Sequence, residues 1–173
     1  MCILDVQTML QWLYASRTYY VSTCTVATLM QSRDSEKVHH ALTHADMVTA
    51  DGMPLVWQQK RAGCDFAERV YGPDILHALC RETEHLNIKH FFYGGWGDVA
   101  LKMQEALKAQ YPALQIVGSF SPDIIDMNNE PQQATIDYIN HLEPDIIWVG
   151  LGSPKQDVWM QCYQPHLNAK LLI

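Results

Sequence analysis

The chain lacks any long apolar run. No window of its 173 residues approaches the roughly 20 apolar residues that a membrane-spanning helix needs. The N-terminus also lacks the basic region and apolar core that are typical of a secretory signal. We therefore expect a protein that is neither secreted nor anchored by a span of its own, and the cytoplasm is its expected location.

Positive charge is also scarce. The sequence has 12 Lys and Arg against 19 Asp and Glu, which gives a net charge of -7. Because proteins that bind nucleic acids usually present a basic surface, we expect no nucleic-acid partner.

Signatures of disulfides and metal sites are missing as well. The five cysteines form no CxxC pair, and their odd number argues against a disulfide framework. His40 and His44 are four residues apart in an expected helix and can share a face as metal ligands, but no HExxH motif accompanies them. Solvated histidines are the preferred interpretation, so we expect no metal site and no cofactor.

What the chain does contain is a regular alternation of strand and helix patterns. Apolar runs predict strands at YYVSTCTV, MVTA, KHFFYGG, LQIVGSF, DIIWVG and AKLLI. Three- and four-residue apolar spacing predicts helices at about 26–44, 53–63, 73–86, 97–110, 131–142 and 154–164. We expect a single α/β domain over residues 1–173, with a Rossmann-like, mostly parallel sheet and helices on both faces. Ligands of such sheets bind outside the carboxyl ends of the strands.

Two segments complicate this simple domain. The polar, Pro-containing link FSPDIIDMNNEP is long enough to be a lid or a surface loop. The final AKLLI reads as a buried strand, yet the chain stops there without a turn, cap or polar tail. We therefore expect a C-terminally truncated domain.

Thr23 and Thr25 bring two hydroxyl groups to the end of the first strong strand. They can bind the phosphate or sugar of a ligand, or they can cap the helix that follows, because threonine is common both in strands and at N-caps.

The stretch TADGMP predicts a strand, a tight turn and a helix. Gly52 allows a backbone angle that other residues resist, and Pro54 suits the first turn of a helix. Asp51 can favour the helix dipole, or it can serve as a general base; position alone does not separate the two roles.

Glycines dominate the stretch FFYGGWGD. Gly94, Gly95 and Gly97 would let a bound group approach the backbone, and the helix that follows offers free N–H groups to an anion. The run GGWGDV does not match the GxGxxG fingerprint of dinucleotide binders. A diphosphate cradle and a plain tight turn both remain open.

The stretch VGLGSPKQ also has two interpretations. Ser153 and Gln156 have the spacing of a capping box, which would account for them structurally. Alternatively, the helix N-terminus receives an anionic ligand, helped by the following residues: Gly150, Gly152, Ser153, Lys155 and Gln156.

An arginine precedes the helix opened by Gly72 and Pro73 in ERVYGPDIL. The guanidinium group of Arg69 suits a diphosphate better than a lysine does, although a surface ion pair with Glu68 is the simpler alternative.

The ordered set ADGMPLVW, ERVYGPDIL, FFYGG and VGLGSPKQDVWM resembles the WecB/TagA/CpsF family of bacterial glycosyltransferases, from about Tyr20 to the last residue. Each piece is modest, but their order and spacing are specific. The resemblance implies inverting, metal-independent transfer of a sugar, of the N-acetylmannosamine type or a related hexose, from a UDP-sugar. The implied acceptor is a saccharide linked to polyprenyl diphosphate at the cytoplasmic membrane face, in the synthesis of teichoic acids and other surface polysaccharides.

The resemblance also implies roles for single residues. Asp51 is the general base, Thr23 and Thr25 belong to the sugar and acceptor pocket, Arg69 contacts diphosphate or acceptor, and Gln156 contacts the donor. No DxD metal motif occurs.

Two departures from the family pattern keep a rival hypothesis open. Several members have asparagine where this chain has Thr25, and the family continues into a basic C-terminal segment, thought to close the site and touch the membrane, that this chain lacks. The rival is a non-catalytic nucleotide-binding α/β module.

Overall fold

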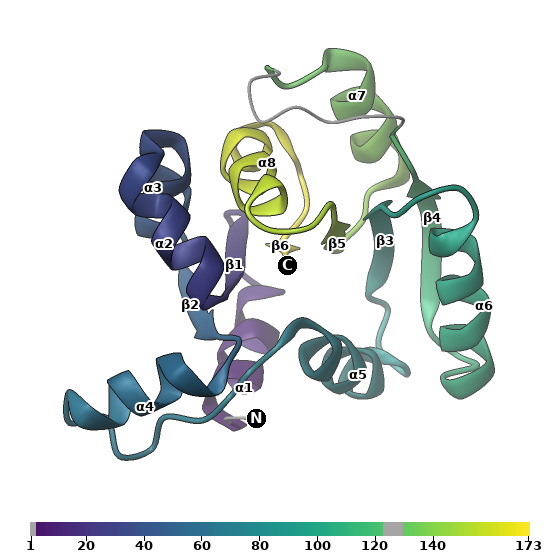
Figure 1. Ribbon diagram of the computed structural model, residues 1–173. Helices are drawn as coiled ribbons and strands as arrows, with labels where there is room; N and C mark the ends of the chain where they lie inside the picture. The colour runs from purple at the N-terminus through teal and green to yellow at the C-terminus, as the bar shows by residue number, and fades with distance from the viewer. Residues whose placement is uncertain (1–2, 123–129) are drawn as a thin grey trace.

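Six parallel strands form one sheet in the order β2-β1-β6-β5-β3-β4. The computed structural model in Figure 1 describes residues 3–122 and 130–173. All six predicted strands are confirmed: β1 Tyr19–Cys24, β2 Met47–Ala50, β3 Lys89–Gly94, β4 Gln115–Phe120, β5 Ile146–Gly150 and β6 Leu171–Leu172.

Apart from α1, which precedes β1, the helices lie between the strands in the chain, as the alternating pattern predicts. Their bounds are α1 Ile3–Trp12, α2 Val26–Asp34, α3 Glu36–Thr43, α4 Met53–Arg61, α5 Gly72–Thr83, α6 Val99–Gln110, α7 Gln133–Leu142 and α8 Lys155–Tyr163, followed by the 3-10 turn Gln164–His166. Among the described residues, no helix combines the length and apolarity needed to cross a membrane.

Two apolar layers cover the two faces of the sheet. Helices α1, α5 and α6 pack on one face, and α7 and α8 pack on the other. In β3, Phe92 contributes to the first layer and its neighbour Phe91 to the second, because successive side chains of a strand point to opposite faces. The predicted α/β fold with helices on both faces is therefore confirmed.

Two helix predictions differ from the structure. The single helix expected over 26–44 is wrong, because Ser35 ends α2 and begins α3, its hydroxyl accepting the N–H of Val38 at 3.5 Å. Helix α1 was not predicted. Of the link expected to be a lid or a loop, residues 123–129 lie outside the described part of the chain.

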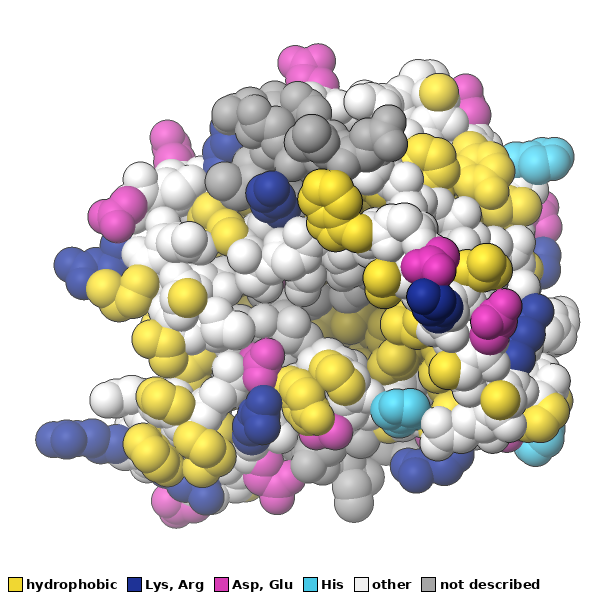
Figure 2. Space-filling view, turned by 45° about the vertical axis from the view of Figure 1, so that its right-hand side comes forward, with side chains coloured by type: hydrophobic (Ala, Val, Ile, Leu, Met, Phe, Trp, Pro, Cys, Tyr) yellow, Lys and Arg dark blue, Asp and Glu magenta, His cyan; other side chains and the backbone are white. Residues whose placement is uncertain are grey.

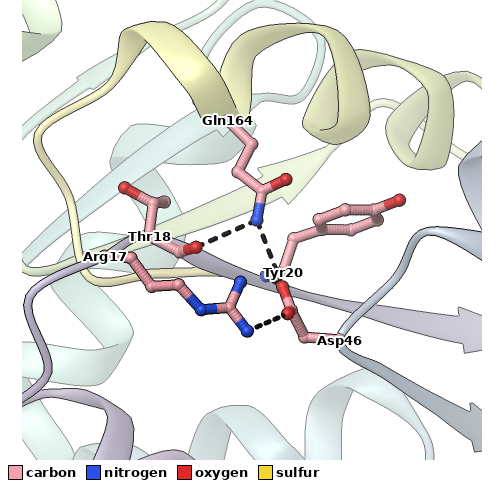
Figure 3. A network of polar contacts seen from close by, with 5 residues as sticks. All are labelled: Arg17, Thr18, Tyr20, Asp46 and Gln164. Atoms are coloured by element: carbon pink, nitrogen blue, oxygen red, sulfur yellow. Dashed lines mark hydrogen bonds and ion pairs between the residues drawn. The ribbon is translucent and has the colours of Figure 1, made fainter.

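A polar network closes the amino-terminal end of β1 (Figure 3). The Asp46 carboxylate accepts hydrogen bonds from the Tyr20 N–H at 3.0 Å, from Arg17 at 2.6 Å and from the Gln164 amide at 3.1 Å. Gln164 also donates to the Thr18 carbonyl at 2.9 Å. One carboxylate thus ties the start of β1 to the turn before β2 and to the end of α8.

Asp145 plays the same part on the other side of the sheet. It precedes β5, and its carboxylate accepts the Lys89 N–H at 2.8 Å while its own N–H donates to the Lys89 carbonyl at 2.8 Å. In both places an aspartate just before a strand therefore accepts an N–H from the start of a neighbouring strand, Tyr20 in β1 and Lys89 in β3.

His90 is a buried, neutral bridge between α5 and β5. The Trp148 indole N–H can only donate, so Nδ1 of His90 accepts at 3.0 Å and Nε2 carries the proton. Nε2 then donates to the Thr83 hydroxyl at 2.9 Å, which itself donates to the Leu79 carbonyl at 2.6 Å. Burial lowers the pKa of His90 to about 4.

The glycines after β3 are required by the backbone. Gly94 has φ +115°, and a Cβ there would overlap the Gly150 carbonyl group. The next residue, Gly95, donates its N–H to that carbonyl at 3.0 Å. Gly97 also has positive φ, at +55°, but no atom of the described residues, its chain neighbours aside, lies within 4 Å of where its Cβ would be. The tight-turn interpretation accounts for all three glycines without a ligand.

We predict that Gly94→Ala destabilises the fold far more than Gly97→Ala. The first change forces a backbone shift where two strand ends meet and should cost about 3 kcal/mol or more. The second meets open space and should cost about 1–2 kcal/mol, from its left-handed backbone alone. Urea unfolding of both variants measures this difference, and equal costs would show that the contact with Gly150 is not the reason for the glycine.

We predict that His90 makes the protein sensitive to acid. The unfolded chain binds a proton at His90 near pH 6.5, whereas the folded protein resists protonation until about pH 4. Its contribution to stability is therefore present above pH 6.5 and is lost as the pH falls to 4, a loss on the order of 3 kcal/mol. Urea unfolding at pH 7 and at pH 4 gives the fall in the free energy of unfolding between the two pH values. This fall should be smaller for His90→Gln than for wild type. Thr83→Val, which keeps the histidine, should show the wild-type fall. Parallel curves for wild type and His90→Gln would contradict the prediction.

Candidate active site

A pocket of about 360 Å³ opens at the carboxyl edge of the sheet, beside the ends of β1 and β5. Figure 2 shows the molecule hollowed near the middle of one face, with hydrophobic side chains in the hollow. Apolar side chains of Leu76, Met103 and Trp148 line the pocket, and its polar lining comes from the loops after β1, β2 and β5. It brings together six of the predicted site residues: Thr23, Thr25, Asp51, Gly150, Ser153 and Gln156.

Asp51 stands at the turn between β2 and α4, and the predicted strand, turn and helix are confirmed. Its N–H donates to the Cys24 carbonyl at 2.8 Å, and Gly52, with φ +146°, is the N-cap of α4 with Pro54 in the first turn. Within the described part of the chain, no side chain caps this helix. The carboxylate of Asp51 is therefore not used by the helix start; it lines the pocket and is about 25% exposed.

Arg69 does not line the pocket, but it forms an ion pair with Asp51, which does. Its guanidinium donates to Asp51 Oδ1 at 3.3 Å and lies 4.3 Å from the centre of the Tyr71 ring. At 48% exposure, the arginine still presents donors to solvent beside the pocket mouth. This pair places a positive and a negative group side by side where a ligand can meet both.

The structure distinguishes Thr23 from Thr25 in the two roles predicted for them, which are helix capping and ligand binding. Thr25 is the N-cap of α2: its hydroxyl accepts the Thr28 N–H at 3.1 Å, so the capping interpretation is confirmed for it. Thr23 lies in β1 and is half-buried, and its hydroxyl bonds to no other group of the described residues. Thr23 is thus the better placed of the two to bind a ligand through its side chain.

Of the two interpretations of Ser153 and Gln156, the capping box is wrong. The helix begins at Lys155 with Pro154 as its N-cap, so Ser153 does not occupy the capping position, and no side chain of the described residues caps the helix. Gln156 instead donates its backbone N–H to the Gly152 carbonyl at 3.1 Å, and the residue lines the pocket. The side-chain amide of Gln156 therefore remains available to bind a ligand.

Four predicted residues lie away from the Asp51 pocket. Gly94 and Gly95 form the turn against Gly150. Gly152 and Lys155 line a second pocket of about 420 Å³ between the α8 loop and the α2–α3 corner. The structure therefore places Lys155 in a different pocket from Gly150 and Gln156, with which the sequence pattern grouped it, and Ser153 lines both pockets.

Sequence reasoning missed Asp157, which is completely buried in the first turn of α8. Its Oδ1 accepts a hydrogen bond from Ser22 Oγ at 2.6 Å, whereas its Oδ2 has no partner among the described residues. Burial raises the pKa of this carboxyl, and the Ser22 hydrogen bond opposes that rise. Ser22 and Asp157 are neighbours of Thr23 and Gln156, so their bond holds opposite walls of the pocket together.

An acid in the first turn of a helix is an ordinary dipole partner in sequence terms, and nothing in SPKQD shows that Asp157 is buried. Within the residues that the structure describes, no group of three or more His, Cys, Asp or Glu could hold a metal ion.

Comparison with known proteins agrees with this geometry. The glycosyl transferase WecG/TagA/CpsF family model matches residues 4–173. A protein of Staphylococcus aureus strain MRSA252, named N-acetylglucosaminyldiphosphoundecaprenol N-acetyl-beta-D-mannosaminyltransferase, is 27% identical over 98% of this chain and 68% of its own length. Its counterpart in strain NCTC 8325 is 26% identical over the same shares.

These matches cover the loops that form the pocket as well as the sheet that carries them. The chain belongs to the WecG/TagA/CpsF family, and it is a glycosyltransferase.

Proposed function

We propose that this chain is the core of an inverting glycosyltransferase that moves an N-acetylmannosamine-type sugar or a related hexose from a UDP-sugar to a saccharide on polyprenyl diphosphate. The observation that carries the proposal is the carboxylate of Asp51, which lines the pocket, is not used by the helix start, and pairs with Arg69. The names of the staphylococcal relatives support an N-acetylmannosaminyl group and a diphosphoundecaprenol-linked acceptor.

The pocket offers one carboxylate, which favours a single displacement. A double displacement would need a nucleophile to hold the sugar as well as a base, whereas Asp51 is the only acidic residue among the described residues that line the pocket. In a single displacement, the acceptor hydroxyl attacks the anomeric carbon and passes its proton to Asp51. The bond from that carbon to the diphosphate oxygen breaks, and UDP leaves with the electron pair.

The departing diphosphate needs positive charge to meet it. Arg69 lies beside Asp51, and the N-terminus of α8 opens toward the pocket at Ser153 and Gln156. Fixed donors of this kind stabilise charge as it develops, at no cost of reorganisation. The second pocket, with Lys155, lies on the other side of the same loop and supplies a further positive group nearby.

We also propose that the protein works in the cytoplasm at the inner face of the cell membrane, because a polyprenyl-linked acceptor is held in that membrane. The Asp51 pocket, with its fixed turn and paired arginine, favours this transferase over a non-catalytic nucleotide-binding module. Contact with the membrane through a C-terminal segment stays a prediction from the family resemblance.

Asp51→Asn should lower kcat for sugar transfer by about 10² to 10⁴, because it removes a general base. Binding of UDP, measured by calorimetry, should change little, since the amide keeps the shape of the side chain. Asp74→Asn is the matched control: this exposed acid opens α5 next to the pocket without lining it. Transfer at the wild-type rate by Asp51→Asn would refute the assignment.

The stereochemistry of the product tests the single displacement independently. An α-linked donor should give a β-linked product, which the one-bond carbon–proton coupling at the anomeric centre reports by NMR; in manno sugars the H1–H2 coupling is small for both anomers. Retention of the donor configuration would rule out the mechanism even if Asp51 proved essential.

A further inference from the structure

We propose that helix α4 and the loop after it dock on the surface of an anionic lipid membrane, at the side of the pocket where Asp51 lies. This α4 surface consists of Met53, Trp57, Lys60, Arg61 and Phe66. The proposal deepens the proposed function, on which it rests for the lipid-linked acceptor, by assigning a second membrane contact within the described chain.

Helix α4 projects from the body of the protein, at the lower left of Figure 1. Val56, 2% exposed, is its only buried residue. Large apolar side chains nevertheless face solvent here: Met53 is 45% exposed, Trp57 62% and, in the following loop, Phe66 76%. A helix with one buried residue and an exposed tryptophan lacks a partner for its outer face.

The order of side chains along α4 suits a membrane surface. Met53, Trp57 and Arg61 are spaced by four residues and form one ridge, with Lys60 exposed beside its end. Tryptophan prefers the boundary between lipid and water, and basic residues are attracted to anionic headgroups. Figure 2 shows hydrophobic side chains gathered with Lys and Arg at the lower left, where α4 projects, and some Asp and Glu side chains beneath them.

The charge of the whole chain makes this local pattern significant. With a net charge of -7, the protein as a whole is repelled by an anionic surface, so an approach through basic side chains is favoured over other orientations. Asp65 and Glu68 lie in the loop after α4 and oppose the attraction in part. The apolar side chains are therefore needed as well as the basic pair, as for other peripheral helices.

A membrane explains the position of this surface better than a second copy of the chain does. A parallel pairing of α4 with its own copy would bring Lys60 and Arg61 close to like charges, which is unfavourable. In addition, α4 begins two residues after Asp51, so lipid contact along the helix brings the proposed base close to the headgroup layer. That layer is where the diphosphate of a lipid-linked acceptor lies.

Sedimentation with vesicles tests the proposal without any need for activity. Wild-type protein should bind vesicles of phosphatidylcholine with phosphatidylglycerol more tightly than vesicles of phosphatidylcholine alone. Lys60→Gln with Arg61→Gln should weaken binding to the anionic vesicles about 30-fold, since two basic residues near the surface are lost. Trp57→Ala with Phe66→Ala should weaken binding to both kinds.

Matched controls come from α6, which carries exposed residues of the same kinds. Leu101→Ala, at a side chain 55% exposed, and Lys102→Gln with Lys108→Gln should leave vesicle binding unchanged. The proposal is overturned if wild-type protein binds no vesicles, if the α4 and α6 variants lose binding equally, or if Trp57→Ala abolishes self-association in light scattering without affecting vesicle binding.

Two acceptors separate this proposal from the proposed function. Trp57→Ala should retain transfer to a water-soluble, short-chain diphosphate acceptor and lose it with the same acceptor saccharide embedded in vesicles. Absence of transfer by wild type to both acceptors would count against the proposed function, while the vesicle-binding results would still decide the docking surface. Equal losses on both acceptors would overturn the docking role in transfer.

Discussion

The common direction of the six strands is the constraint on which the pocket depends. Parallel strands present all their carboxyl ends at one edge of the sheet, so the loops after β1, β2 and β5 meet there and bring Thr25, Asp51 and Ser153 to one place. The opposite edge is closed by polar groups: Asp46 and Asp145 accept N–H groups at the starts of neighbouring strands. Hydrogen bonds of the fold thus close the amino-terminal edge of the sheet, while the carboxyl-terminal edge remains open to a ligand.

Buried polar contacts set the geometry of that open edge. The bond between Ser22 and Asp157 joins β1 to α8 directly behind the pocket, and it does so in an apolar interior where an unpaired carboxylate is costly. The close approach of Gly94 to Gly150 fixes the ends of β3 and β5 in the same way. The pocket is therefore built on rigid elements, whereas α4 beside it is attached through little buried surface. On our proposals, the rigid part receives a soluble nucleotide sugar and the projecting part meets the lipid.

Much of the fold was predictable because its signals are local. Apolar runs bounded by turn residues located all six strands, and the Gly52 and Pro54 pattern located the turn that holds Asp51. Prediction failed where two local signals compete. The apolar period of residues 26–44 runs through Ser35, whose capping bond to Val38 nevertheless ends one helix and starts the next. Likewise, Ser153 and Gln156 have the spacing of a capping box, but the helix begins at Lys155.

The sequence by itself determined the α/β alternation, the family, and the position of Asp51 just after a strand, since each follows from residue order and short-range periodicity. Only the tertiary structure decided which candidates share a pocket. It brought Asp51 to Arg69 and Gln156, placed Lys155 in a separate pocket, and revealed the buried partner of Ser22 in Asp157, 135 residues away. Contacts between distant segments depend on strand order and helix packing, which no local pattern encodes. Burial likewise distinguishes Asp157 from an ordinary surface acid at a helix start, because desolvation is a property of the folded surroundings.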